Sequence, residues 1–159
     1  MSAAKLIEIL DKMCRLHVLL YEQAQKKTEI IKENDMNGLD QMLKEEQKFV
    51  AAINTMEKQR QLTAQQFTGR ETATLSDCIE RAAGAEKEKL QQLQGQLLEL
   101  VSQLKYQNEL NQKLIYQSLQ FVNMNLGLLQ PSKPESATYS NPMKQAAKPA
   151  SRSLFDAGV

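Results

Sequence analysis

Proline is confined to one end of this chain. Its four prolines, Pro131, Pro134, Pro142 and Pro149, all follow residue 130. Proline in a helix interior costs about 3 kcal/mol, so the proline-free residues 1–130 can form long uninterrupted helices. Leu, Gln, Lys, Glu, Ala and Met dominate the composition, and all six are good helix formers. The sequence therefore predicts an all-α domain over residues 1–130, followed by a flexible tail over 131–159.

Four helical segments are expected, over residues 2–33, 38–67, 75–83 and 85–129. Ser2 and Asn37 are the expected N-caps of the first two segments. The short polar turn before the second segment makes the first two antiparallel neighbours. The predicted architecture is an elongated antiparallel bundle or coiled coil of three main helices plus a short one.

Apolar residues recur at helical spacing in both segments of this hairpin. In the first segment they form the stripe Leu6, Leu10, Met13, His17, Leu20, Ala24 and Ile31. In the second segment they form the face Leu39, Met42, Leu43, Phe49, Val50, Ile53 and Met56. Both sets are expected to face the core.

The charge and hydropathy of the chain disfavour several partners. The net charge is +1, so no strong field draws nucleic acid or an anionic membrane. No apolar run approaches the 18 residues of a membrane-spanning helix, and the first residues do not resemble a signal peptide. Two distant cysteines, Cys14 and Cys78, are typical of reduced thiols in the cytoplasm.

The residues needed for catalysis or metal binding are scarce. His17 is the one histidine, and it falls on the apolar stripe of the first helix, where a core role is expected. A zinc site usually needs four Cys or His ligands, and the chain has three such residues. No phosphate loop, nucleophile elbow, zinc-protease or calcium-loop motif occurs. We therefore expect no enzyme, no metal and no cofactor.

The end of the last helical segment carries more apolar residues than one helix contact can bury. Between residues 110 and 129 these residues surround much of the helix. A third helix, a second copy of the chain or a helix of a partner must cover the excess. The candidate binding residues are Leu114, Ile115, Leu119, Val122, Leu126 and Leu129.

The same segment resembles the FlgN-type flagellar export chaperones. Its most specific part, residues 108–122, is similar to the family pattern that begins with two asparagines three apart, here Asn108 and Asn111. A second similarity lies between Tyr21 and Glu57 and includes Lys26, Lys27, Ile31, Leu43 and Glu46. A third lies in the tail, at Thr138-Tyr139-Ser140 and Leu154-Phe155-Asp156.

The resemblance implies a small cytoplasmic chaperone without catalytic activity. Such chaperones bind the C-terminal helical segments of hook-associated proteins, which form the hook–filament junction. They prevent premature assembly and deliver these clients to the type III export gate. The resemblance places client binding on the last helix and assigns Tyr139 to docking on the cytoplasmic domain of the gate.

Two other functions fit the same residues. One is a structural coiled-coil or adaptor protein that dimerises through its last helix. The other is an export chaperone for a different flagellar client, such as flagellin or the filament cap. The sequence does not fix the oligomeric state.

Overall fold

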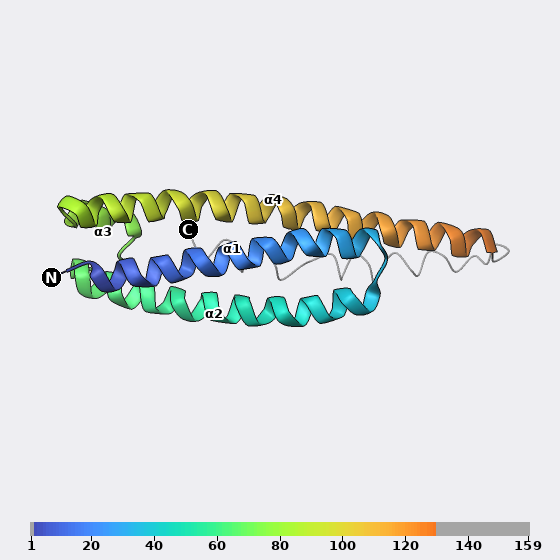
Figure 1. Cartoon of the computed structure of the whole chain (residues 1–159), viewed down its shortest axis with the longest axis horizontal. Helices are drawn as coiled ribbons and strands as arrows, with labels where there is room; N and C mark the ends of the chain where they lie inside the picture. The colour runs from blue at the N-terminus through green and yellow to red at the C-terminus, as the bar shows by residue number, and fades with distance from the viewer. Residues whose placement is uncertain (1, 130–159) are drawn as a thin grey trace. The chain divides into compact units, whose positions relative to one another are not determined.

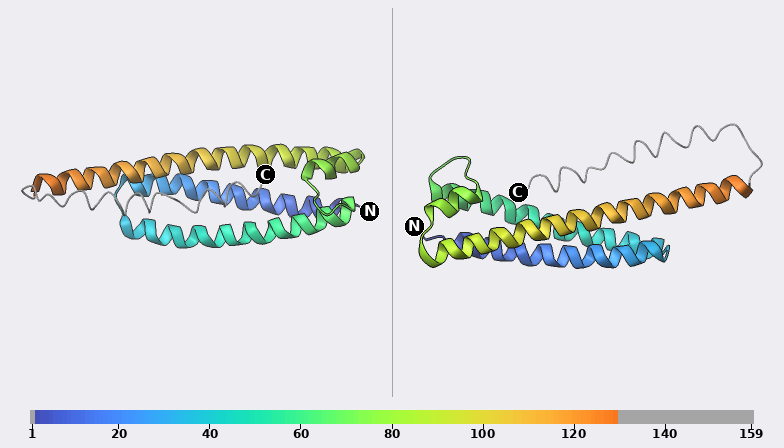
Figure 2. Two further views of the ribbon diagram at one scale, coloured as in Figure 1. Left: turned by 180° about the vertical axis from the view of Figure 1, so that it is seen from behind. Right: turned by 90° about the horizontal axis from the view of Figure 1, so that it is seen from above.

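The computed structural model describes residues 2–129 and confirms the all-α prediction. Its helices are α1 (Ala4–Lys32), α2 (Met36–Thr68), α3 (Leu75–Arg81) and α4 (Gly84–Leu129). The described helices divide between two units, with the boundary within α4, between Asn111 and Gln112. Within the first unit, α2 runs antiparallel to α1, and the first part of α4 runs beside α1 in the same direction (Figures 1 and 2).

One face of α1 is buried along the whole length of the helix. All seven residues of its predicted stripe are buried, and Leu6, Leu10 and Ala24 have no exposed surface. This burial follows from the position of α1, which contacts α2 along the hairpin and α4 through side-chain hydrogen bonds. The polar residue Thr28 joins the buried stripe near the end of the helix.

The two N-caps predicted for this hairpin were wrong. Ala3 precedes α1 and provides no side-chain cap, because the Ser2 hydroxyl lies one residue too early. That hydroxyl accepts from the Ala4 N–H and donates to Glu86 of α4. At α2 the cap is Asp35 rather than Asn37, because the helix already begins at Met36.

The turn between α1 and α2 depends on two backbone features. Asn34 adopts the left-handed conformation, with φ of 57°, and reverses the chain. The Asp35 Oδ1 atom then accepts from the Gly38 N–H at 2.9 Å, which satisfies one of the free amides at the start of α2. A Cβ atom at Gly38 would lie 2.3 Å from Asp35 Oδ2, so an alanine here would force the Asp35 carboxylate out of its capping position.

We expect Asp35→Ala to lower the free energy of unfolding by about 1 kcal/mol through loss of the cap. Gly38→Ala should have a similar effect, because its new methyl group displaces the same carboxylate. The double variant should then cost little more than either single one, since both changes remove one interaction. Urea unfolding of the four proteins checks this, and additive losses would show that the cap and the glycine act separately.

The predicted apolar face of α2 is less buried than expected. The fully buried residues of α2 are Thr63, Ala64 and Phe67, which lie near its end. Its predicted face is half-buried, and Leu43 is 41% exposed. Over most of its length α2 packs on α1, and α3 joins only at the end, so deep burial begins where a further helix covers the hairpin.

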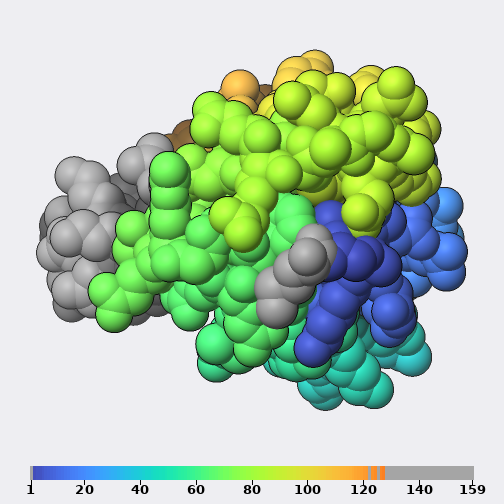
Figure 3. Space-filling model, turned by 90° about the vertical axis from the view of Figure 1, so that its left-hand side faces the viewer, coloured from blue at the N-terminus to red at the C-terminus, as the bar shows by residue number. Residues whose placement is uncertain are grey.

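The main cluster of buried apolar side chains lies where α1 begins, α2 ends, and α3 and α4 meet. Figure 3 shows the end of the molecule where these segments come together. Helix α2 stops at Gly69, which takes the left-handed conformation with φ of 70°. A reciprocal cap between Thr74 and Asp77 then starts α3. These breaks place short helix α3 against the bundle, and its Cys78 and Ile79 join a core that includes Leu6, Leu10, Phe67, Leu90 and Leu93.

The first turn of α4 also holds the start of α1. The Glu86 carboxylate accepts hydrogen bonds from the Ala3 N–H at 2.7 Å and from the Ser2 hydroxyl at 3.0 Å. A carboxylate at the N-terminal end of two helices is favoured by both helix dipoles.

Candidate functional site

A buried polar layer joins α1 and α4 at the end of the first unit. Asn111 is 2% exposed, and its Nδ2 donates to the Ala24 carbonyl of α1 at 2.9 Å. The Thr28 hydroxyl donates to Asn111 Oδ1 and accepts from the Gln107 amide. Replacing Asn111 would leave the buried Thr28 hydroxyl without this acceptor, so the layer fixes the register of α4 on α1.

The two asparagines of the family pattern therefore have different surroundings. Asn111 is part of this polar layer, whereas Asn108 is half-buried and accepts no hydrogen bond at Oδ1 from the described residues. The structure gives Asn111 a clear packing role.

After Asn111, residues 112–129 form the rest of α4, which we call the C-terminal segment. It is a single helical stretch about 27 Å long, at 1.5 Å per residue. From Leu114 to Leu129 the sequence contains no charged residue. Its polar residues are amides and hydroxyls, so a partner would find neutral hydrogen-bonding groups and apolar side chains there.

Large apolar side chains of this segment are exposed to solvent. The exposed fraction is 45% for Leu119, 66% for Phe121, 68% for Met124 and 52% for Leu126. Single exposed apolar side chains are ordinary, but a run of them on a helical stretch without charged residues marks an interaction surface. Ile115 and Leu114 of the predicted set are half-buried, and the side chains of Val122 and Leu129 lie outside the described part of the structure.

Helical spacing sorts these residues into two stripes. We call Ile115, Leu119, Val122, Leu126 and Leu129 the first stripe. The second stripe is Leu114, Gln117, Phe121 and Met124. At about 100° per residue, the two stripes are centred about 140° apart on the helix. Leu114, which the sequence grouped with the binding residues, lies on the second stripe.

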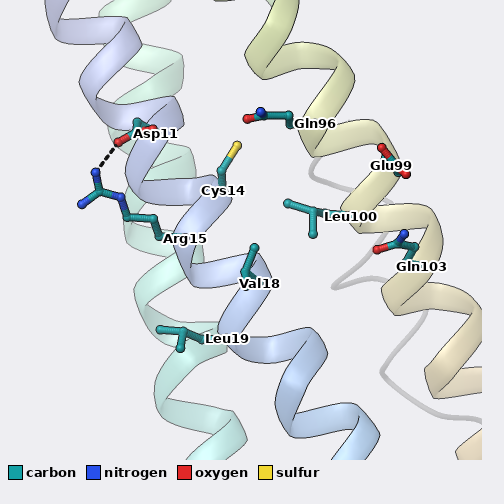
Figure 4. A pocket seen from close by; sticks show the side chains of 9 residues that line it. All are labelled: Asp11, Cys14, Arg15, Val18, Leu19, Gln96, Glu99, Leu100 and Gln103. Atoms are coloured by element: carbon teal, nitrogen blue, oxygen red, sulfur yellow. Dashed lines mark ion pairs between the residues drawn. The ribbon is translucent and has the colours of Figure 1, made fainter.

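An open groove in the first unit is a separate surface, which sequence reasoning missed. It has a volume of about 700 Å³ and lies between α1 and the middle of α4 (Figure 4). Its walls combine exposed Val18 and Leu19 with Leu100, and the Asp11–Arg15 ion pair at 2.8 Å lies at its edge. Only the packing of two helices distant in sequence creates such a groove.

The residues considered for chemistry lie in the packed interior. His17 is 9% exposed, and its Nδ1 lies 2.7 Å from the Met13 carbonyl, an ordinary intrahelical contact. Cys14 and Cys78 are buried free thiols, and burial raises the pKa of both. A high pKa keeps a thiol protonated and unreactive. Among residues 2–129, no group of three His, Cys, Asp or Glu side chains is arranged to hold a metal ion.

The second region of family similarity contributes structural contacts. Lys27 of α1 and Glu46 of α2 form an ion pair at 2.8 Å, with side chains 12% and 16% exposed. Glu57 pairs with Arg60 on α2. These half-buried pairs fix side chains along the hairpin, whereas Leu43 is exposed.

The predicted docking residue and the predicted tail are not part of the described structure. Tyr139 and the rest of the tail lie outside the described residues.

Within residues 2–129, no helix is long and apolar enough to cross a bilayer.

The chain is similar to known proteins over nearly its whole length. Residues 1–147 match the family model described as FlgN protein. The chain is also 37% identical over 158 residues to YvyG of Bacillus subtilis (strain 168), described as an uncharacterized protein, and the match covers 98% of each chain. No solved structure matches the chain.

Proposed function

Because this chain belongs to the FlgN family of flagellar export chaperones, we propose that it binds C-terminal helical segments of hook-associated proteins. The first stripe of the C-terminal segment is the proposed contact. In this role the chaperone acts in the cytoplasm, prevents premature assembly of its clients and delivers them to the export gate.

The observation that carries this proposal is the exposure of apolar side chains on the part of α4 between Leu114 and Leu129, which has no charged residue. Leu119 and Leu126 are about half exposed, and both belong to the first stripe. An amphipathic client helix laid along this stripe would remove that apolar surface from water, at about 25 cal/mol per Å² buried. No nucleotide is needed for release, because such a contact can be of moderate affinity once ordering costs are subtracted.

Co-expression with the two hook-associated junction proteins, followed by gel filtration, tests the choice of client. We expect the chaperone to co-elute with a junction protein. Flagellin and the filament cap protein serve as comparison clients. Preferential co-elution with flagellin or the cap would assign the chaperone to that client, and a client-free dimer would favour the adaptor function.

We further propose that Tyr139 docks the loaded chaperone on the cytoplasmic domain of the export gate. A tyrosine suits a short linear contact, because it buries a large ring with few rotamers and offers one hydroxyl. We expect Tyr139→Ala to weaken binding to the gate domain by about tenfold, or 1.4 kcal/mol, and to leave client affinity unchanged. Paired titrations of both proteins against client and gate domain measure this. Equal gate affinities, or a loss of client affinity, would remove Tyr139 from this role.

A further inference from the structure

The second stripe gives the C-terminal segment another largely apolar surface, in which Gln117 lies among three apolar residues. Its residues Leu114, Gln117, Phe121 and Met124 are spaced three and four apart, which is the spacing that packs against one partner helix. Phe121 and Met124 are 66% and 68% exposed, more than Leu119 and Leu126 of the first stripe. The proposed contact through the first stripe therefore leaves the most exposed side chains of the segment uncovered.

One partner helix cannot cover both stripes. A packed helix covers a stripe about 100° wide, whereas the centres of the two stripes are about 140° apart. A segment that is apolar on opposite sides is typical of a helix enclosed by neighbours on both sides. We infer that the C-terminal segment is held between two helices of a single client molecule, one helix on each stripe. This inference rests on the proposed function.

The absence of charged residues between Leu114 and Leu129 predicts the chemistry of the client helices that can bind there. Neither stripe has a charged residue beside it between Leu114 and Leu129, so no ion pair can select the partner there. A charged client side chain at the contact would lose its hydration without gaining a counter-charge. The matching client faces are therefore apolar, edged by neutral polar residues, and binding should depend little on salt concentration.

A second copy of the chain is a poorer occupant of the second stripe. Both stripes are apolar and uncharged, so a copy that pairs with one stripe has the same reason to pair with the other. Two different self-pairing faces on one molecule join each chain to two others, and the assembly need not close at a dimer. A client with two connected helices covers both stripes at once, and the second contact benefits from the high effective concentration set by the first.

Adding one charge to the second stripe tests this inference. Gln117→Lys places a cation at the centre of that stripe, and Asn123→Lys places the same charge between the two stripes as a matched control. Gln117 is exposed, and lysine is a good helix former, so this variant should fold. Leu119→Lys provides the corresponding change in the first stripe.

Affinities of the full-length variants for a purified hook-associated protein are measured by calorimetry, and the mass of each complex by light scattering. We expect Gln117→Lys to weaken binding by about tenfold or more, Asn123→Lys by less than about threefold, and complexes of one chaperone with one client. Phe121→Ser should reproduce the effect of Gln117→Lys without adding a charge.

The other possible outcomes distinguish a failure of this inference from a failure of the proposed function. If Gln117→Lys binds as tightly as the original chain while Leu119→Lys does not, the second stripe is unused and only this inference fails. If neither change matters, the proposed site itself fails. A lower self-associated mass in Gln117→Lys with unchanged client affinity would assign the second stripe to another copy of the chain. A complex with two client molecules would also overturn the inference.

Discussion

Replacing both Leu119 and Leu126 with aspartate is expected to abolish client binding. Both side chains are about half exposed and lie one above the other on the first stripe of α4. A client helix that packs on this stripe would have to bury two carboxylates without counter-charges, which costs several kcal/mol per ion. Even a total loss of about 4 kcal/mol weakens binding nearly a thousandfold.

The measurement is a calorimetric titration of the full-length variant against a purified hook-associated protein. Circular dichroism provides the control, because the exposed positions should tolerate the change and the helical signal should persist. Lysine at Asn123, between the stripes, is the matched charged variant. Undiminished affinity in the doubly substituted protein would remove the first stripe from client binding, and loss of the helical signal would show that the leucines belong to an internal core.

The second large effect concerns stability. Leu10 has no exposed surface and lies in the core where α1 packs near α3 and the start of α4. Leu10→Ala should lower the free energy of unfolding by about 2–5 kcal/mol, since it removes buried methyl groups and leaves a cavity. The matched control is Leu98→Ala on α4, where leucine is 45% exposed and the expected change is within about 0.5 kcal/mol.

Chemical denaturation followed by circular dichroism measures both variants. A loss at Leu10 no greater than that at Leu98 would contradict the assigned core. The comparison is informative because both changes remove the same side-chain atoms, so the difference between them reports burial alone.

The local pattern was sufficient to predict the helices and the core face of α1. Its seven predicted stripe residues are all buried, because α2 and α4 lie beside this helix and together cover the stripe. The same reasoning overestimated burial on α2, where Phe49 and Ile53 are only half covered. Periodicity shows which face of a helix is apolar, but it does not show how many helices pack against that face.

The errors at the helix ends have a similar cause. Ser2, Asp35 and Asn37 all have side chains that can cap a helix, and a shift of one or two residues in the helix start decides which of them does so. The carboxylate that holds the start of α1 comes from Glu86, which is distant in sequence. No local pattern contains that information.

Part of the candidate site was predictable. The apolar excess at the end of α4 pointed to a binding surface, and Asn111 stood out in the sequence as part of the family pattern. Its partner Thr28 did not, because a threonine on a helix is usually unremarkable and becomes informative only when Asn111 lies against it. The groove between α1 and α4 was missed for the same reason, since it requires knowledge of which helices are neighbours.

Amide hydrogen exchange of the full-length chain, with and without a bound hook-associated protein, tests whether the client lies on the C-terminal segment. Helix amides exchange slowly when a partner prevents local opening. The account predicts that client binding slows exchange most strongly between Leu114 and Leu129 and leaves the α1–α2 hairpin nearly unchanged. Protection confined to the groove around Val18 and Leu100, with no change in the C-terminal segment, would contradict it.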